Sequence, residues 1–103
     1  MSSPVIRGSY TLTSPQTVSV AASGSATVSI SFTPLGAGNL YVYITLPTGV
    51  TATISIGTQT VSLSSGSNQF LIPANVAIGN ITINNSNTTA VSVVVWALFI
   101  EVA

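Results

Sequence analysis

Short runs in which an apolar residue alternates with a hydroxyl residue recur along this chain. One run alternates Ala26, Val28, Ile30 and Phe32 with Thr27, Ser29 and Ser31. A strand points successive side chains to opposite faces, so such alternation predicts strands with one buried and one polar face. Val, Ile and Thr supply 37 of the 103 residues, and their branched side chains favour pleated strands. Because no stretch shows a convincing 3.6-residue period, the sequence predicts an all-β protein.

Clusters of Gly, Pro, Ser and Asn separate these runs at intervals of roughly 8 to 12 residues, which is typical of sandwiches and barrels. The expected strands span 4–13, 16–22, 26–33, 39–46, 50–56, 59–64, 69–72, 77–84 and 90–102. Pro15 is expected to break or bend the first pair. We predict one domain over residues 1–103, an antiparallel two-sheet β-sandwich of about 8 strands. Jelly-roll and immunoglobulin-like topologies both fit, because periodicity does not give strand order.

Charge is nearly absent from the chain. Arg7 is the one basic residue and Glu101 the one acidic residue, and there is no His or Cys. A serine nucleophile needs a base, a glycosidase generally needs two carboxylates, and metal sites need several His, Cys or acidic ligands. We therefore expect no enzyme activity, no catalytic residue, no cofactor and no metal. One Arg cannot neutralise a phosphate backbone, so nucleic acid is not an expected partner.

The segment from Ala90 to Val102 is apolar at both odd and even positions, which is typical of a strand buried on both faces. A long loop could cover its second face, or a neighbouring subunit could. A membrane-inserted β element is a third reading, but its backbone edge would be unsatisfied in lipid. The longest apolar stretch, residues 93–100, is far shorter than the about 20 residues of a spanning helix, so no membrane span is expected. The candidate interface residues on this strand are Val94, Trp96, Leu98 and Ile100.

Tyr41 and Tyr43 share the strand face opposite Leu40, Val42 and Ile44. If the aliphatic set is core, the two tyrosines point outward. They join the candidate interface, because exposed aromatic pairs suit protein contacts. The alternatives are stacking against a saccharide or simple covering of their own sheet.

Two further features mark the ends of the chain and its Asn-rich region. Arg7 falls in the first expected strand and Glu101 in the last, so they form a candidate ion pair if those strands are neighbours. An exposed pair would stabilise the fold by only about 0–1 kcal/mol. Asn80, Asn84 and Asn87 each begin an N-x-S/T sequence, which makes them glycosylation candidates in a secreted or surface protein.

Short β-proteins rich in Ser, Thr, Val and Ile and nearly free of charge are found among coat and filament subunits. In its stretch from Thr17 to Phe32 and its tail from Thr88 to Ala103, this chain resembles such proteins, including capsid proteins of archaeal viruses. The resemblance is one of composition and implies an extreme habitat and no particular site residue. Uncharged hydroxyl-rich strands also pack against identical neighbours without desolvating ions.

We therefore expect a self-assembling structural protein in a virion or an extracellular surface assembly, most readily a capsid or capsid-associated subunit. Its partners would be copies of itself and other structural proteins. The first alternative is a pilus or fibre subunit that donates residues 1–13 or 90–103 to a neighbour's sheet. The second is a glycan-binding adhesion module that uses Tyr41 and Tyr43.

Overall fold

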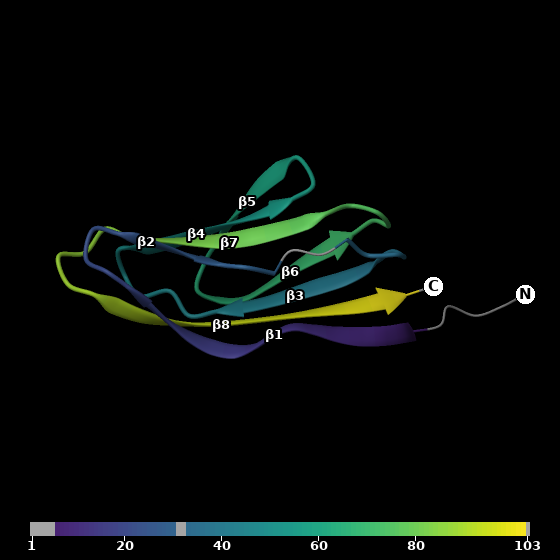
Figure 1. The fold of residues 1–103 in the computed structure, drawn as a ribbon, viewed down its shortest axis with the longest axis horizontal. Helices are drawn as coiled ribbons and strands as arrows, with labels where there is room; N and C mark the ends of the chain where they lie inside the picture. The colour runs from purple at the N-terminus through teal and green to yellow at the C-terminus, as the bar shows by residue number, and fades with distance from the viewer. Residues whose placement is uncertain (1–5, 31–32, 103) are drawn as a thin grey trace, which may run out of the picture.

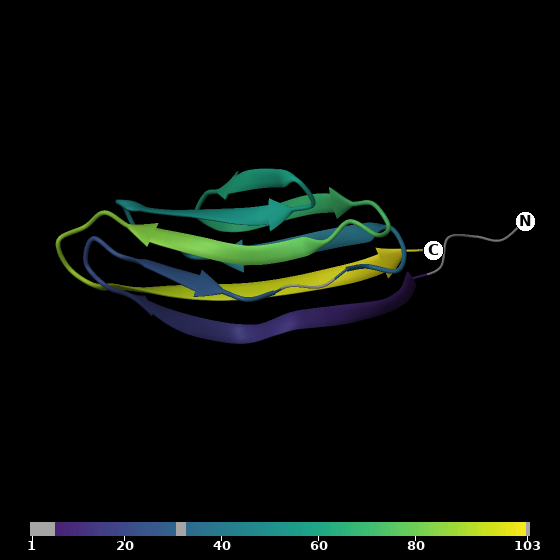
Figure 2. The same ribbon diagram turned by 45° about the horizontal axis from the view of Figure 1, so that its top comes forward.

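A computed structural model describes the backbone of residues 6–30 and 33–102, and the side chains of residues 17–30 and 33–100. The described residues form eight strands in two antiparallel sheets of four, stacked face to face (Figure 1 and Figure 2). The strands are β1 (Ile6–Val20), β2 (Ser25–Val28), β3 (Gly38–Ile44), β4 (Val50–Ile56), β5 (Gln59–Leu63), β6 (Gly66–Ile72), β7 (Ile78–Asn85) and β8 (Val91–Val102). The predicted all-β antiparallel sandwich of about eight strands is therefore confirmed.

The order of strands decides the topology that the sequence left open. One sheet has the order β1-β8-β3-β6 and the other the order β2-β7-β4-β5. The pairs β1–β8, β2–β7, β3–β6 and β4–β5 are those of one long nested hairpin, rolled so that neighbouring pairs fall in opposite sheets. This arrangement is a jelly roll, whereas an immunoglobulin fold would place its first two strands in the same sheet.

Alternation builds the core between the two sheets. In β3 the residues Leu40, Val42 and Ile44 are fully buried, and in β7 the residues Ile81 and Ile83 are fully buried as well. These side chains come from the inner faces of opposite sheets and belong to one hydrophobic cluster. Removing such aliphatic surface from water supplies the main driving force for folding.

Three predicted strand boundaries are wrong. The segments 4–13 and 16–22 form one strand, β1, whose described part starts at Ile6 and whose pairing with β8 shifts register between Thr11 and Gln16. Pro15 lies inside this irregular stretch and cannot donate to a ladder, so the strand bends there instead of ending. The strand expected over 26–33 ends at Val28, and residues 31–32 lie outside the described part. The strand expected over 69–72 already begins at Gly66, whose φ of 94° is a turn conformation that glycine adopts readily.

Candidate functional site

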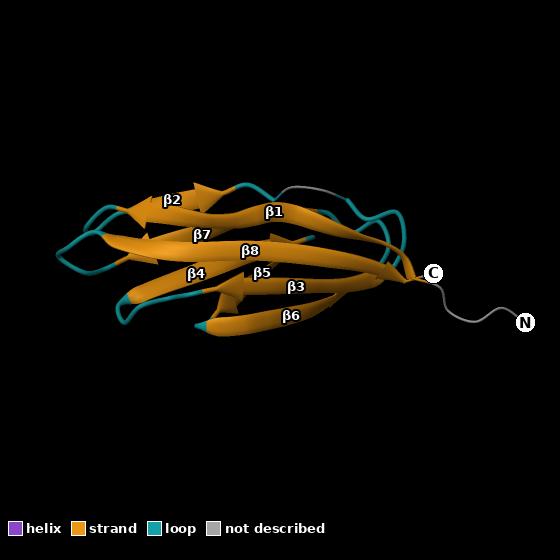
Figure 3. Cartoon of the chain, turned by 90° about the horizontal axis from the view of Figure 1, so that it is seen from below, coloured by secondary structure: helices purple, strands orange, loops and turns teal. Residues whose placement is uncertain are grey.

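β8 is a central strand with apolar side chains on both faces. It lies between β1 and β3, and its residues Val93, Val95, Ala97 and Phe99 are fully buried in the core. The alternate residues Val94, Trp96, Leu98 and Ile100 are only partly buried. Figure 3 views the sheet from its outer side, and no described loop crosses over β8 there. In the described part of the chain, no loop therefore covers the second face of this strand, and the neighbouring subunit stays a prediction.

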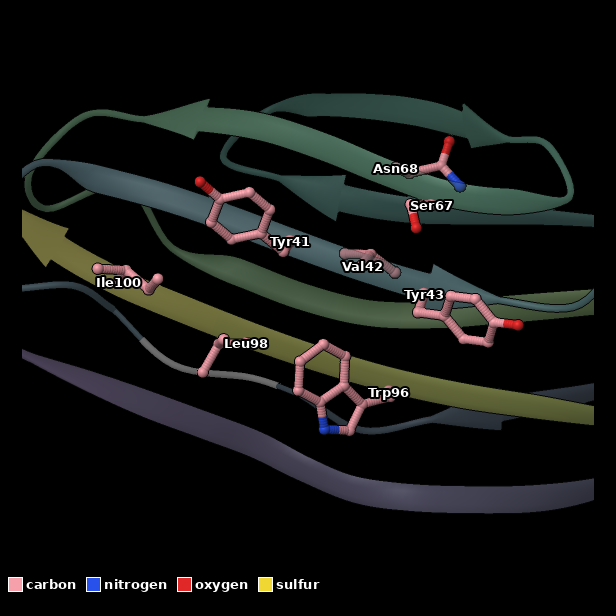
Figure 4. Close-up of a pocket in the computed structure, with 8 residues that line it drawn as sticks. All are labelled: Tyr41, Val42, Tyr43, Ser67, Asn68, Trp96, Leu98 and Ile100. Carbon is pink, nitrogen blue, oxygen red and sulfur yellow. The ribbon is translucent and has the colours of Figure 1, made fainter.

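Pairing of β3 with β8 brings all six predicted interface residues onto this outer side. Tyr41 is the register partner of Leu98, and Tyr43 is the partner of Trp96. We call the following set the apolar patch: Tyr41, Tyr43, Val94, Trp96, Leu98 and Ile100. Figure 4 shows the two tyrosines along β3, with Trp96 of β8 across from Tyr43 and Leu98 across from Tyr41. Tyr43 is 41% exposed, whereas Tyr41 and Trp96 are partly buried.

A shallow groove of about 330 Å³ runs across the apolar patch. Besides five patch residues, Val42 of β3 and Ser67 and Asn68 of the neighbouring strand β6 line it. The side-chain Nδ2 of Asn68 donates a hydrogen bond to the Ser64 carbonyl at 3.0 Å. The groove therefore offers mainly aromatic and aliphatic surface, with a hydroxyl at one border.

Leu71 extends the apolar surface to the edge of the sheet and was missed in the sequence. It lies on β6 at 79% exposed, opposite Asn39 of β3, which in turn pairs with Ile100. Pairing between distant strands, and not the local pattern, places it beside the patch. No signal in the sequence gives that neighbourhood.

The outer face of the second sheet has the opposite character. Its outward residues are hydroxyls and amides: Ser25, Thr27, Thr51, Thr53, Ser55, Thr60, Ser62, Asn80, Thr82 and Asn84. Thr27, Thr82 and Thr53 stand in one row across β2, β7 and β4. The sandwich therefore has one outer face with an apolar patch and one outer face of hydroxyls and amides, both without charge on their described side chains.

The two charged residues lie in neighbouring strands, as expected. Glu101 of β8 is the register partner of Gly8 in β1, and Arg7 directly precedes Gly8 in the chain. The side chains of Arg7 and Glu101 lie outside the described residues, so the ion pair stays a prediction. Clusters of three or more His, Cys, Asp or Glu do not occur among the described residues. That part of the chain also holds no helix long and apolar enough to cross a membrane.

The three candidate glycosylation residues differ in their surroundings. Asn80 and Asn84 lie on β7 with exposed side chains. Asn87 lies in the turn after β7, where its Nδ2 donates to the Thr48 carbonyl at 2.9 Å. A glycan on Asn87 would break this contact, and Asn87 is also less exposed than Asn80 and Asn84. Glycosylation itself stays a prediction.

Asn85 is a structural residue that the sequence did not reveal. Among the described side chains it is the one polar residue that is buried, at 3% exposed. Its Nδ2 donates to the carbonyls of Val20, Ala21 and Thr89, and its Oδ1 accepts from the Asn87 backbone N–H. The amide thereby ties the turn after β1 to the turn after β7.

Comparisons with known proteins show fold and not family. No protein-family model matches the chain, and no curated protein matches it. The solved structure of FlhE is 13% identical with a TM-score of 0.56, over 92% of this chain and 94% of that one. A periplasmic inhibitor of g-type lysozyme from Aeromonas hydrophila is 11% identical with a TM-score of 0.51, over 96% and 91% of the two chains.

A third solved structure is the C-terminal domain of a structural protein from sulfolobus turreted icosahedral virus. It is 21% identical with a TM-score of 0.49, and the match covers 91% of this chain and 99% of that chain. The likeness to FlhE and to the lysozyme inhibitor is one of fold alone, and the compositional resemblance to capsid proteins stays a prediction.

Proposed function

We propose that this chain is a non-enzymatic, self-assembling structural protein, and that it serves in a virion as a capsid or capsid-associated subunit. The observation that carries the proposal is the apolar patch on the outside of the same strand, β8, that lines the core. Jelly rolls serve as capsid domains, and they also occur in lectins and cupins, so the fold permits this role without selecting it.

The composition of the patch suits an interface between proteins. Tyr41, Tyr43 and Trp96 belong to the residue types that are enriched in interface centres, while charged residues are depleted there. A protein with a formal net charge of zero brings no repulsion to contacts with its own copies. A second copy of this chain is therefore the partner that we assign to the patch.

The footprint of the whole four-stranded sheet, of which the apolar patch is a part, sets an upper limit on the contact. Its strands β1, β8, β3 and β6 have 15, 12, 7 and 7 residues. With about 3.4 Å per residue and about 4.8 Å between strands, the sheet covers roughly 670 Å². Standard interfaces bury about 800 Å² of accessible surface per partner. Protruding side chains make the accessible surface of a sheet larger than the area of the sheet plane.

The test is the assembly state of the full chain, measured by analytical ultracentrifugation and negative-stain microscopy. We expect multimers of defined size for the wild type. The double substitution Trp96→Gln with Leu98→Thr is expected to weaken association at least about 100-fold, because it removes two central anchors. The matched control, Thr51→Gln with Ser62→Gln on the hydroxyl-bearing face, should assemble like the wild type. Equal association of both variants would reject the patch as the contact.

A fibre built by strand addition is the first alternative. The segments expected to donate a strand already pair within the chain: Ile6–Val20 pairs with β8, and β8 pairs with β3 on its other side. Donation would require breaking these ladders, which favours a closed assembly of complete sandwiches. Open helical filaments in the micrographs would support the fibre instead.

Saccharide binding is the second alternative, because Tyr41, Tyr43 and Trp96 surround one groove. Aromatic faces stack on sugar rings, but orientation also needs polar partners, and the Asn68 amide already donates to Ser64. Isothermal titration of the full chain with neutral oligosaccharides is expected to give no heat of binding. A saturable signal that Tyr41→Ala abolishes would favour the adhesion module.

A further inference from the structure

Sheet edges are the second kind of surface through which this sandwich can associate. The edge strands are β1 and β6 in one sheet and β2 and β5 in the other, within the described residues. An edge strand presents a row of unpaired N–H and C=O groups, which can pair with another chain. Natural proteins blunt such edges with short strands, proline, bulges or charge, so a long unprotected edge points to a partner.

Three of the four edges are blunted. β1 contains Pro15 and shifts register against β8 between Thr11 and Gln16. β2 has four residues, and β5 has five with the exposed hydroxyl residues Thr60 and Ser62 on its outer side. Short length and irregular pairing both reduce the row of groups that a partner strand could use.

β6 is longer than the edges β2 and β5, and its pairing lacks the register shifts of β1. Its seven residues contain no proline and no charge. They pair with β3 in an unbroken register from Ile44–Gly66 to Gly38–Ile72, and the positive φ of Gly66 is confined to the first residue of the strand. Its outer row carries Ser67, Gln69 and Leu71, and Leu71 is 79% exposed. An exposed apolar side chain on an edge strand promotes aggregation of a monomer, but it contributes buried apolar contact when the edge pairs with a second copy.

We propose that β6 of one copy pairs antiparallel with β6 of a second copy about a two-fold axis. An antiparallel edge is self-complementary under such an axis, because each strand offers the other the same alternation of donors and acceptors. The two four-stranded sheets then form one eight-stranded sheet, and the two apolar patches lie on the same face of it, separated by the outer rows of the two β6 strands. The inference rests on the proposed self-assembly, but it uses a different surface from the patch.

The joined sheet also accounts for the exposure of Leu71. With Gln69 near the axis, Leu71 of one copy stands opposite Ser67 of the other and packs beside that strand's outer row. The partner strand then covers one side of the Leu71 side chain, without any change in the fold of either subunit. The edge contact would form the dimer, and the two patches on the same face would then be the surface for higher assembly.

Amide hydrogen exchange, followed by NMR on the full chain, tests this pairing. About half of the β6 amides point away from β3, because donors alternate sides along an edge strand. Between low micromolar and near-millimolar protein we expect their exchange to slow at least about tenfold. The matched control is the β5 edge, whose outward amides should exchange at the same rate at both concentrations.

Variants separate the edge from the patch. Gln69→Lys with Leu71→Lys should abolish the concentration-dependent protection of β6, whereas Thr60→Lys with Ser62→Lys on β5 should retain it. The patch variant Trp96→Gln with Leu98→Thr should also retain it, because it leaves the edge intact. Multimers with no protection of β6 would overturn the edge while the proposed function stands. A chain that stays monomeric at every concentration would overturn both.

Discussion

Asn85 illustrates how one buried amide can hold two distant turns together. Its four side-chain hydrogen bonds join the chain after β1 to the chain after β7, with donor–acceptor distances from 2.9 to 3.3 Å. Its backbone N–H also donates to the Gly24 carbonyl at 2.8 Å. In the sequence Asn85 lies between the glycosylation candidates Asn84 and Asn87. Its burial was not predicted, because no local pattern distinguishes a buried asparagine from an exposed one.

Replacing this amide should be costly although the residue looks like an ordinary turn residue. Asn85→Ala leaves buried carbonyls without a donor, so we expect the free energy of unfolding to fall by about 2–4 kcal/mol. Asn84→Ala, one residue away and exposed, should change it by less than about 0.5 kcal/mol. Urea unfolding at a concentration where both variants are monomeric measures the difference. Similar midpoints for the two variants would contradict a structural role for the Asn85 network.

At the scale of the element, alternate residues of β8 are expected to contribute to different properties: the core residues to folding stability and the outer residues to association. Phe99 is fully buried in the core, while its neighbour Leu98 lies on the apolar patch. Phe99→Ala is expected to lower the free energy of unfolding by about 3–5 kcal/mol, because it leaves a cavity. Leu98→Ala should lower it by less than about 1.5 kcal/mol, since part of that side chain is already in water.

The same pair of variants should behave in the opposite order in an association assay. Leu98→Ala is expected to weaken multimers clearly, whereas any Phe99→Ala protein that remains folded should associate like the wild type. Thermal unfolding and sedimentation velocity on the same samples give both quantities. A core-like loss of stability from Leu98→Ala would mean that its outer side is covered within the subunit.

The sequence predicts the positions of most strands, but not the order in which the strands pair. The strand expected over 90–102 is observed as Val91–Val102, and its two apolar faces are real. Alternation reports which side of a strand is buried, so the six patch residues could be assigned to one side of their own strands. It contains no information on which strands pair, since pairing joins residues far apart in the chain. For this reason the jelly-roll order, the exposed edge β6 and the position of Leu71 emerge only from the structure.

At the scale of the whole molecule, the sandwich combines a core without charge and two unlike outer faces. One sheet presents aromatic and aliphatic side chains, and the other presents hydroxyls and amides. Such polarity gives an assembled layer an inside and an outside without using charged residues. The exposed Asn80 and Asn84 lie on the hydroxyl-bearing face, so glycans there would not obstruct contacts made by the apolar patch.

Near-absence of charge also predicts how stability depends on solvent. Acid denaturation arises mostly from carboxylates whose protonation differs between the folded and unfolded states, and this chain has a single side-chain carboxylate, Glu101. An exposed ion pair of Glu101 with Arg7 would contribute only about 0–1 kcal/mol. For a domain of this size, 1 kcal/mol corresponds to roughly 4–8 °C in Tm. Acidification removes the carboxylate charge, so any change of this origin would lower Tm at low pH.

We therefore expect Tm to stay within about 10 °C between about pH 2 and pH 9. Calorimetry across this range, with sedimentation at each pH to hold the assembly state constant, makes the measurement. Moderate additions of sodium chloride at fixed pH serve as the control, because a protein with two charged side chains offers salt almost nothing to screen. A larger shift with pH at constant assembly state would mean that terminal or side-chain charges contribute more to folding than their number allows. An assembly that dissociates with pH while Tm of the monomer stays constant would instead place the charged pair at a contact between subunits.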